Sequence, residues 1–425
     1  MKISFNWLKE HLPIHVEIEE ASRILTDTGL EVEGVSAYES IPGSLQGIVV
    51  GKVMHVEKHP DADRLNLTRV DVGAESLLDI VCGAPNVAIG QSVAVAMVGA
   101  ELHPSEGESF TIKKSKIRGA ISEGMLCAED ELGLGKGHDG IMVLEDSWTA
   151  GSPLSEVFSV YNDTVIEIGL TPNRMDAISH RGVARDLVAY LNLGEEVKMK
   201  ALDLKVPQGS GGKIKVQVLD KDACARYSGI ELKGINVGPS PAWLANRLSA
   251  IGLSPINNVV DITNYIMHDL GQPLHAFDAD KINGERIHVR KALKGEKFIT
   301  LDAQNRELHE DDLMICDEKN PLCIAGVFGG KSTGVSEQTT RIFLESAVFD
   351  TVSVRKTAKR HQLNTDSSFR FERGVDPEGT LIALAKAVQL LIEVCGAEVS
   401  SELVDIYPVP VKPLELELNL EKANA

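Results

Sequence analysis

Hydrophobic residues recur with two different periods along the chain, and each change of period marks a predicted element. Within residues 19–28 the apolar residues fall on one helical face, and Gly29 follows as a residue suited to end a helix. Residues 31–35 instead alternate between polar and apolar side chains, which predicts a strand. The start of the chain is therefore predicted to combine helix and strand, and it carries no pattern typical of catalysis.

Short apolar runs separated by turns dominate residues 41–150. Evenly spaced runs of this kind, punctuated by glycine, are typical of a small closed β-barrel. The expected strands are residues 48–56, 67–72, 77–81, 92–97 and 110–117.

Helical periodicity returns further along the chain and is interrupted by one clear linker. Residues 181–193 carry an apolar face that stops at Gly194. Residues 208–212, with the sequence QGSGG, have the composition of a linker, and alternating apolar residues after them begin a new domain. That domain is predicted to contain helices over residues 240–251 and 376–395, together with several β-rich runs.

The most unusual stretch is NNVVDITNYIMHDLGQPLHAFD, residues 257–278, because its polar residues are packed densely among apolar ones. Buried polar groups cost free energy unless they are hydrogen-bonded. The stretch is therefore either a rigid internal network or the wall of a pocket. A Gly-Gln-Pro turn at residues 271–273 interrupts it and presents His275 just beyond the turn.

Two later stretches favour the pocket. Residues 322–330, LCIAGVFGG, form an apolar strand that ends in small residues, which lets the backbone approach a ligand or another strand closely. Glu345 is a single carboxylate inside the apolar run 342–349. A buried carboxylate must be paired, hydrogen-bonded or functional, and the residue alone does not decide between these roles.

Charge limits the kinds of partner that the chain can bind. The formal net charge is −19, which argues against nonspecific binding of nucleic acid over the whole surface. Residues 41–150 contain nine basic and sixteen acidic residues, and one basic cluster that is either a nucleic-acid contact or a solvated strand edge. The cluster consists of Lys113, Lys114, Lys116 and Arg118. Residues 351–373 instead carry six basic residues against two acidic ones, which suits a phosphate backbone.

Composition argues against several other classes. The six cysteines form no CxxC pair, so a cysteine-rich zinc site is not expected. The first residues lack the hydrophobic region of a secretory signal, and no apolar run is long enough to span a bilayer. We therefore expect a cytoplasmic protein with free thiols and no membrane contact, and its 425 residues predict roughly three domains.

Six motifs, taken together and in order, resemble the β subunits of bacterial phenylalanyl-tRNA synthetases. One such motif would be weak support, but six in the family's order do not arise by coincidence. The resemblance covers essentially the whole chain, and because family members are much longer it implies an N-terminal portion that lacks the C-terminal domains. The motifs are HPDADRL, IVCGAPN, TPNRMDAISHRGVARDL, the stretch 257–278, IAGVFGG and SSFRFERGVDP.

The resemblance implies a multidomain α+β fold. Residues 1–40 and 151–200 would form a split N-terminal α+β domain, in which residues 41–150 are inserted as an oligonucleotide-binding (OB) β-barrel that binds tRNA. Residues 213–399 would form a larger α+β editing domain, and residues 400–425 would begin a truncated further domain. The family's magnesium ligands lie in the fuller form of that last domain. We therefore expect no cofactor in this chain, although the complete enzyme uses Mg²⁺ and ATP.

The family divides its chemistry between subunits. The resemblance implies that the α subunit of an α2β2 heterotetramer makes Phe-tRNA, while the β subunit binds tRNA(Phe) and hydrolyses mischarged Tyr-tRNA(Phe). A pocket shaped for phenylalanine rejects an added hydroxyl only weakly, by about a hundredfold in a comparable case, so a second site must recognise that hydroxyl. The alternative is a non-catalytic scaffold and tRNA-docking subunit with an inactive pocket. A free-standing RNA-binding barrel is disfavoured by the acidic balance of residues 41–150.

Carried over residue by residue, the family's editing pocket falls on two sets of positions. The catalytic set would be His275, Glu345, Asn264 and Thr263. The substrate-binding set would be Gly326, Thr365 and Ser367. Glu345 would bind the tyrosine hydroxyl, His275 and Asn264 would orient substrate or the attacking water, and Gly326 would make room for the aminoacyl group.

Two further expectations concern RNA contacts and a departure from the family. The basic residues of the window 355–373, Arg360 and Arg370 among them, would join the basic cluster of the barrel as tRNA contacts. Ser367 stands where many family members have alanine. Its hydroxyl would either narrow the pocket or add a hydrogen bond, which bears on how tightly tyrosine is selected.

Overall fold

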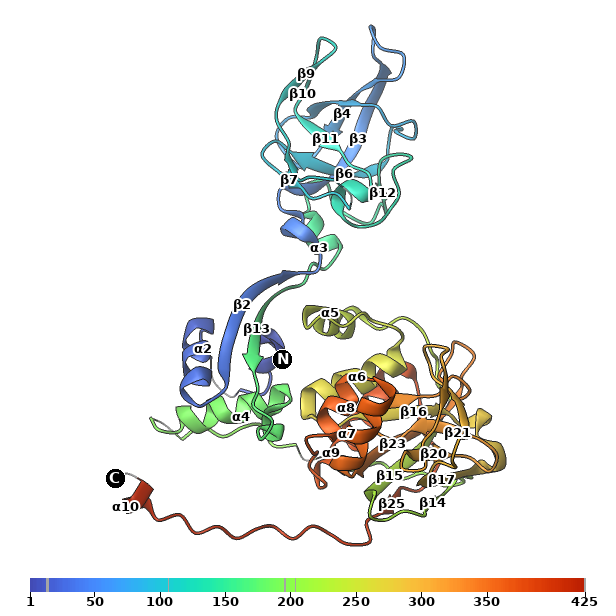
Figure 1. Cartoon of the computed structure of the whole chain (residues 1–425). Coiled ribbons are helices and arrows are strands. Elements are labelled where there is room, and N and C mark those ends of the chain that lie inside the picture. The colour runs from blue at the N-terminus through green and yellow to red at the C-terminus, as the bar shows by residue number, and fades with distance from the viewer. Residues whose placement is uncertain (13–14, 106, 195, 203, 424–425) are drawn as a thin grey trace. The chain divides into compact units, whose positions relative to one another are not determined.

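The chain folds into two compact units, which are drawn in Figure 1. One unit combines Met1–Ser36 with Val165–Ala425, and the other is Ala37–Thr164. Together they confirm the multidomain α+β class. The residues that the computed structural model describes are 1–12, 15–105, 107–194, 196–202 and 204–423.

The unit Ala37–Thr164 is a β-barrel. Its main strands are β3 (Ile48–Lys58), β4 (Asn66–Asp71), β5 (Leu78–Cys82), β6 (Ser92–Met97), β11 (Gly124–Leu126) and β12 (Val143–Leu144). They lie in the order β11-β6-β3-β4-β5, with β12 also paired to β6. Because β5 contacts β11 as well, the two ends of the sheet meet in a nearly closed barrel, which confirms the OB-type fold expected here.

Shorter elements complete the barrel unit. The single strand expected over residues 110–117 is split in two, and exposed lysines lie between its halves. β8 (Phe110–Thr111) pairs with β7 (Glu101–Leu102), and β9 (Ser115–Ile117) pairs with β10 (Ala120–Ser122). The remaining elements are η1 (Pro42–Leu45), η2 (Asp130–Leu132) and α3 (Leu154–Val157).

The N-terminal part of the other unit is a small α+β layer. Its elements are β1 (Lys2–Ser4), α1 (Phe5–Lys9), α2 (Ile18–Asp27), β2 (Glu31–Glu39), β13 (Asn162–Gly169), η3 (Met175–Ala177) and α4 (His180–Leu191). β13 lies between β1 and β2. Trp7 is fully buried, and its ring stacks on His180 and Tyr265 with centroids 3.9 and 4.5 Å away. Since Tyr265 belongs to a helix of the following region, this stacking ties the N-terminal layer to that region.

The rest of this unit contains two five-stranded sheets. The first has the order β16-β23-β15-β24, with β25 also paired to β15, and the second has the order β14-β17-β20-β21-β22. The strands of the first are β15 (Cys224–Lys233), β16 (Leu274–Asp278), β23 (Arg341–Phe349), β24 (Glu398–Val399) and β25 (Val404–Ile406). Those of the second are β14 (Lys215–Val218), β17 (Arg286–Lys291), β20 (Leu313–Cys316), β21 (Pro321–Ile324) and β22 (Phe328–Gly329).

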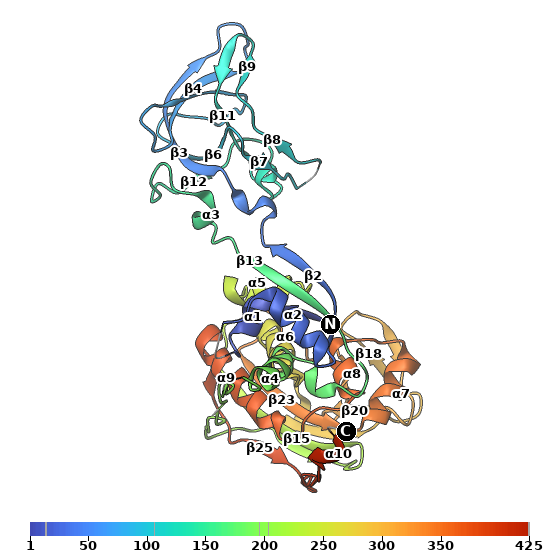
Figure 2. The same ribbon diagram turned by 90° about the vertical axis from the view of Figure 1, so that its left-hand side faces the viewer.

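Helices and short elements surround these sheets, as Figure 2 shows from a second direction. The helices around the sheets are α5 (Ala242–Ala250), α6 (Asn258–Leu270), α7 (Thr351–His361), α8 (Asp366–Phe371) and α9 (Gly379–Cys395), and α10 (Leu420–Ala423) ends an exposed C-terminal segment. The remaining elements are η4 (Ala279–Lys281), η5 (Asn283–Glu285) and the hairpin of β18 (Lys297–Ile299) and β19 (Asn305–Glu307).

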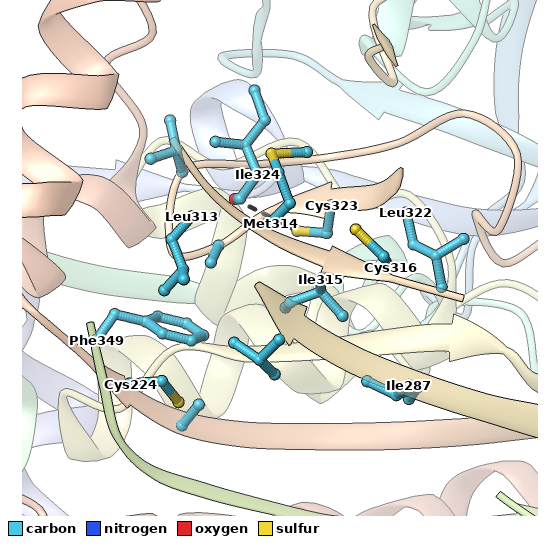
Figure 3. Close-up of a cluster of buried hydrophobic side chains, with 14 of the residues drawn as sticks. Cys224, Ile287, Leu313, Met314, Ile315, Cys316, Leu322, Cys323, Ile324 and Phe349 are labelled. Carbon is cyan, nitrogen blue, oxygen red and sulfur yellow. Dashed lines mark hydrogen bonds between the residues drawn. The ribbon is translucent and has the colours of Figure 1, made fainter. Parts of the chain in front are cut away.

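Strand β23 lies between two apolar cores because both faces of its sheet are covered. Ile342 and Leu344 pack with residues of α5, α6 and α9. Phe343 and Ala347, on the opposite face, pack with residues of the second sheet in the core that Figure 3 shows. Successive side chains of a strand point to opposite faces, so Glu345 also faces the second sheet. A single carboxylate is thereby placed inside an apolar layer.

Residues 322–330 form a tight hairpin of β21 and β22 instead of the single strand expected. The chain reverses at Gly326, whose φ of +70° lies in the left-handed region that favours glycine. The expected linker at 208–212 also packs against the fold, because the backbone N–H of Gly209 donates to the Ser401 carbonyl at 2.9 Å.

Candidate functional site

A cavity of about 520 Å³ lies in the region of the two sheets. Its walls come from α6, β16, the β21–β22 hairpin, β23 and the start of α8. All seven residues that the sequence placed in the pocket line this one cavity, although they are spread over about a hundred positions of the chain. They are Thr263, Asn264, His275, Gly326, Glu345, Thr365 and Ser367.

The registers of the strands place Glu345 and His275 side by side. His275 of β16 lies directly opposite Glu345 of β23 in an antiparallel pair, and such neighbours share one face of the sheet. Glu345 is 5% exposed and accepts a hydrogen bond from the hydroxyl of Tyr227 at 2.7 Å. Burial raises the pKa of the Glu345 carboxyl to about 8, although the Tyr227 hydrogen bond lowers it. The cavity therefore contains a carboxyl that changes charge near neutral pH.

His275 is a neutral imidazole in this cavity. Burial lowers its pKa to about 4, and its ring packs edge-on against Phe277 with centroids 4.4 Å apart. Neither ring nitrogen has a hydrogen-bond partner among the residues that the structure describes. A Cβ atom at Gly329 would lie 2.9 Å from Cε1 of this ring, so the glycine leaves the space that the imidazole occupies. The ring is thus held by packing and keeps its polar atoms for a ligand or water.

Helix α6 presents Asn264 to the same cavity. The helix begins at a good cap, since the Asn257 side chain accepts a hydrogen bond from the Val260 N–H at 3.0 Å, and it ends at Gly271 with a φ of +85°. The Thr263 hydroxyl donates to the Val260 carbonyl at 2.7 Å, which satisfies its own donor. The Asn264 amide has no hydrogen-bond partner within the described ranges, so both its donor and its acceptor can serve a ligand.

The remaining predicted pocket residues hold one turn in place. The Thr365 hydroxyl donates to the Val327 carbonyl at 3.0 Å and also caps α8. The Ser367 hydroxyl donates to the Gly326 carbonyl at 3.3 Å. Of the two effects expected of this serine, the structure thus contains the added hydrogen bond. A Cβ at Gly326 would lie 2.9 Å from the Phe371 ring and 3.0 Å from the Phe349 ring, so this glycine makes room for two aromatic side chains.

The basic residues proposed for tRNA contact differ in exposure. Lys113, Lys116 and Arg118 are exposed on the barrel unit and form no ion pair among the described residues, while Lys114 pairs with Glu123 at 2.6 Å. Arg360, on α7, pairs with the buried Asp312.

Arg370 does not fit the expected role in tRNA contact. Its side chain is only 2% exposed, and one of its guanidinium nitrogens lies 3.5 Å from Asp366. It therefore has almost no surface to offer a phosphate group.

Sequence reasoning missed three residues of this site. Tyr227 reaches Glu345 from β15, Cys323 lines the cavity from β21, and Gly329 gives His275 its space. Only Gly329 carried a signal in the sequence, as one of the small residues that end the run 322–330. The position of Tyr227 follows from the pairing of β15 with β23, which no local pattern encodes.

The described residues also bear on two other kinds of site. No group of three or more His, Cys, Asp and Glu side chains is placed to hold a metal ion in the ranges that the structure describes. None of the helices in those ranges is long and apolar enough to cross a membrane.

Comparison with known families agrees with this division of the chain. A model for a putative tRNA-binding domain matches residues 48–153, which form the barrel. A model for the B3/4 domain matches residues 223–396, which contain the cavity. The chain therefore joins a barrel of the putative tRNA-binding family to a B3/4 domain.

Curated relatives make the assignment more specific. The chain is 51% identical over 428 residues to the phenylalanine–tRNA ligase beta subunit of Porphyromonas gingivalis, and 49% identical to that of Bacteroides fragilis. Each alignment covers 100% of this chain and 52% of the relative. A third relative with the same name, from Salinibacter ruber, is 45% identical over 421 residues, which are 96% of this chain and 50% of the relative. The chain is similar over its full length to phenylalanine–tRNA ligase beta subunits, and it spans about half the length of the curated relatives that it matches.

Proposed function

We propose that this chain binds tRNA and hydrolyses mischarged Tyr-tRNA(Phe) in the cavity that Glu345 and His275 line. In the complete ligase, an α subunit would use ATP and Mg²⁺ to charge tRNA(Phe), and this chain would remove tyrosine attached by error. The partners would assemble as an α2β2 heterotetramer in the cytoplasm. The family name of the relatives supports the ligase context, while the cavity supports the editing role.

The observation that carries the proposal is the buried carboxyl group of Glu345 at the wall of the cavity, on a strand face with apolar neighbours. Its neighbours on the same face of the sheet are apolar residues such as Phe343 and Ala347. A tyrosine side chain would place its ring against apolar lining residues such as Leu274 and Phe328, and its hydroxyl against Glu345. Phenylalanine would leave one oxygen of the carboxyl group without a partner, and a site built to bind a hydroxyl can reject the analogue lacking it by ~10⁴ or more.

The reaction would be water attack on an ester. The oxygen of water bonds to the tyrosyl carbonyl carbon, and the bond from that carbon to the terminal ribose oxygen breaks. The ribose oxygen leaves with a proton, which gives free tyrosine and uncharged tRNA. His275 and Asn264, whose polar atoms have no partner among the described residues, would orient the water and the carbonyl group. Such positioning accounts for catalysis without a dedicated nucleophile.

Contacts to tRNA would come from two basic surfaces. On the barrel unit these are the exposed side chains of Lys113, Lys116 and Arg118. On helix α7 they are the exposed side chains of Arg355, Lys356 and Lys359. Each would meet phosphate groups and contribute affinity that falls with salt.

The direct test is deacylation of Tyr-tRNA(Phe) by the purified chain, with Phe-tRNA(Phe) as the control substrate. We expect release of tyrosine at a rate well above spontaneous hydrolysis and little release of phenylalanine. If the chain binds tRNA(Phe) but releases neither amino acid, it is a scaffold and tRNA-docking subunit with an inactive pocket. Equal release of both would remove the selective role of Glu345.

A further inference from the structure

Tyr227 is an internal tyrosine that already contacts the carboxyl group of the cavity. It lies on β15, the neighbour of β23, and its side chain is fully buried. Gly229 is the residue of β15 directly opposite Glu345, so Tyr227, two positions earlier, shares the face of Glu345. Its hydroxyl donates to Oε2 of Glu345 at 2.7 Å. One carboxyl oxygen is therefore taken by the protein itself.

The second carboxyl oxygen is left for the cavity. Oε1 of Glu345 takes no hydrogen bond from the residues that the structure describes, and it is not among the polar atoms sealed from solvent without a partner. Glu345 lines the cavity, whereas Tyr227 is not among the lining residues. The carboxyl group thus has one face fixed by the fold and one face open to a ligand.

We propose that Tyr227 is a specificity-determining positioning residue, whose hydroxyl fixes Glu345 so that one carboxyl oxygen receives the phenol hydroxyl of a tyrosyl ligand. The proposal rests on the function proposed above. Without the Tyr227 hydroxyl, Oε2 would lie unpaired against the apolar core, and the carboxyl group would gain by turning or by staying protonated. Either response weakens the acceptor that distinguishes tyrosine from phenylalanine.

The groups that face Glu345 make its titration observable. From the neighbouring strands these are Tyr227 and Cys224 of β15, His275 of β16 and Cys323 of β21, and Asp366 lies at the cavity from α8. Burial raises the pKa of both thiols and of the Tyr227 phenol, and lowers that of His275 to about 4. Of the four groups on these strands, none changes charge between about pH 6 and pH 9, whereas Glu345 does.

The test measures the affinity of the full chain for free tyrosine and free phenylalanine by calorimetry between pH 6 and pH 9. In the unaltered chain, tyrosine affinity should rise with pH as Glu345 ionises and becomes a charged acceptor. Tyr227→Phe removes only the hydroxyl. We expect tyrosine to bind about tenfold more weakly, because the loss of a hydrogen bond to a charged group changes the binding free energy by about that much. Phenylalanine affinity should stay unchanged, and the pH midpoint for tyrosine should move upward.

A second change shifts the midpoint in the opposite direction. Incorporation of 3,5-difluorotyrosine at position 227 keeps the hydroxyl and makes it a stronger donor, which stabilises the carboxylate and should move the midpoint downward. Because it nearly preserves the shape of the side chain, this variant keeps the proposal testable if Tyr227→Phe fails to fold. A merely structural tyrosine would give no such opposed shifts.

The matched control is Tyr265→Phe, another buried tyrosine, whose hydroxyl accepts from Arg247 at 3.4 Å and which does not line the cavity. This variant should change neither the ratio of tyrosine to phenylalanine affinity nor the pH midpoint of tyrosine binding. One outcome is that the unaltered chain prefers tyrosine while both Tyr227 variants keep its ratio of tyrosine to phenylalanine affinity and its pH midpoint. In that case the role of Tyr227 is overturned and the proposed function survives. If the unaltered chain shows no preference for tyrosine, both are overturned.

Discussion

A single hydrogen atom of Gly329 determines where the imidazole of His275 can lie. A Cβ at this position would meet Cε1 of the ring at 2.9 Å, closer than real Cβ atoms approach other heavy atoms. The ring would have to move toward the cavity or turn about its own bond. For a reaction that depends on a positioned water, displacement of this size is costly.

Gly329→Ala should therefore slow Tyr-tRNA(Phe) deacylation by roughly tenfold to a hundredfold while tyrosine affinity changes little. Single-turnover deacylation together with calorimetry would separate the two effects. Gly238→Ala is the matched control, because a Cβ there meets no heavy atom within 4 Å. An unchanged deacylation rate in Gly329→Ala would mean that the ring position does not matter to the chemistry.

Glu345→Gln gives a prediction about pH. Glu345 has a raised pKa of about 8, so its charged form is present above that pH and is lost as pH falls through it. Tyrosine affinity of the unaltered chain should accordingly fall below about pH 8. The amide does not titrate, so the variant should bind tyrosine equally well across pH 6 to 9, and more weakly than the unaltered chain at pH 9. If tyrosine affinity changes with pH in the same way in both proteins, this assignment is contradicted.

At the scale of single residues, the sequence predicted which side chains line one cavity but not the hydrogen bonds that several of them form. The seven pocket residues were found through motifs, and all seven line one cavity. Their bonding was not predictable, because Thr365 and Ser367 donate to backbone carbonyls of a hairpin whose turn is not visible in the sequence. A contact between near neighbours is simpler, as in the ion pair of Arg174 with Asp176 at 3.0 Å, since the two residues are only two positions apart along the chain.

Helix α6 is the element on which the cavity depends most. One of its faces carries Thr263 and Asn264, and its other face is anchored by the buried Asp269. That carboxylate accepts from Trp7 Nε1 at 2.7 Å, from His11 Nε2 at 2.6 Å and from Lys386 Nζ at 2.5 Å. The N-terminal segment and α9 are thus both fastened to the helix that forms the cavity wall.

Asp269→Asn should lower the free energy of unfolding by about 3 kcal/mol, because it leaves a charged lysine without its buried partner. Urea unfolding followed by tryptophan fluorescence, to which the buried Trp7 contributes, would measure the loss. Asp27→Asn, which removes an exposed partner of Arg23, should change stability by less than about 0.5 kcal/mol. Equal losses in the two variants would show that the buried network contributes nothing specific.

The same carboxylate should contribute to acid unfolding. Burial alone would raise the pKa of Asp269, but the hydrogen bond from His11 and the charge of Lys386 outweigh burial and lower it. A carboxyl group whose pKa is lowered in the folded state stabilises the fold at pH values above its unfolded pKa of about 4. This stabilisation is lost as the pH falls below that value. Melting temperature should fall less steeply between pH 5 and pH 3 in Asp269→Asn than in the unaltered chain.

The element most misjudged from the sequence is the glycine-rich segment 208–212. Its composition is that of a free linker, yet a Cβ at Gly212 would lie 2.1 Å from that of Ser401. Glycine is therefore needed here for close packing and not for flexibility alone. Composition cannot separate these two uses, because both require a residue without a side chain.

For the whole molecule, an acidic chain must bind an acidic polymer through local patches. The net charge is −19, so the proposed binding of tRNA would depend on places such as the exposed cluster that contains Lys116 and Arg118. The double variant Lys116→Glu and Arg118→Glu should weaken tRNA binding and reduce the slope of log affinity against log salt by about 2.

Filter binding of tRNA(Phe) at several salt concentrations would measure that slope. The control for net charge is Lys136→Glu, at an exposed lysine of the same unit outside the cluster, compared with Lys116→Glu alone, which changes the net charge by the same amount. If both variants weaken binding equally, the cluster is an ordinary solvated strand edge and the contact to RNA lies elsewhere.

The order of the domains was predictable because each carries its own local motifs and its own period of hydrophobic residues. The way in which the strands close into a barrel and the two sheets enclose the cavity was not. Those arrangements depend on pairing between residues far apart in sequence, such as Tyr227 with Ala347.

The chain enters and leaves each of its two large domains at neighbouring points. Strands β2 and β13, which lead into and out of the barrel, are neighbours in one sheet, and Gly209 is hydrogen-bonded to Ser401 across the two ends of the other domain. Each domain is thus a segment whose two ends lie side by side, like an insertion into a shorter chain. Genetic recombination can insert, exchange or delete such a domain without stretching the rest of the chain, and the barrel, which is a compact unit of its own, can be exchanged without loss of the stacking of Trp7 on Tyr265.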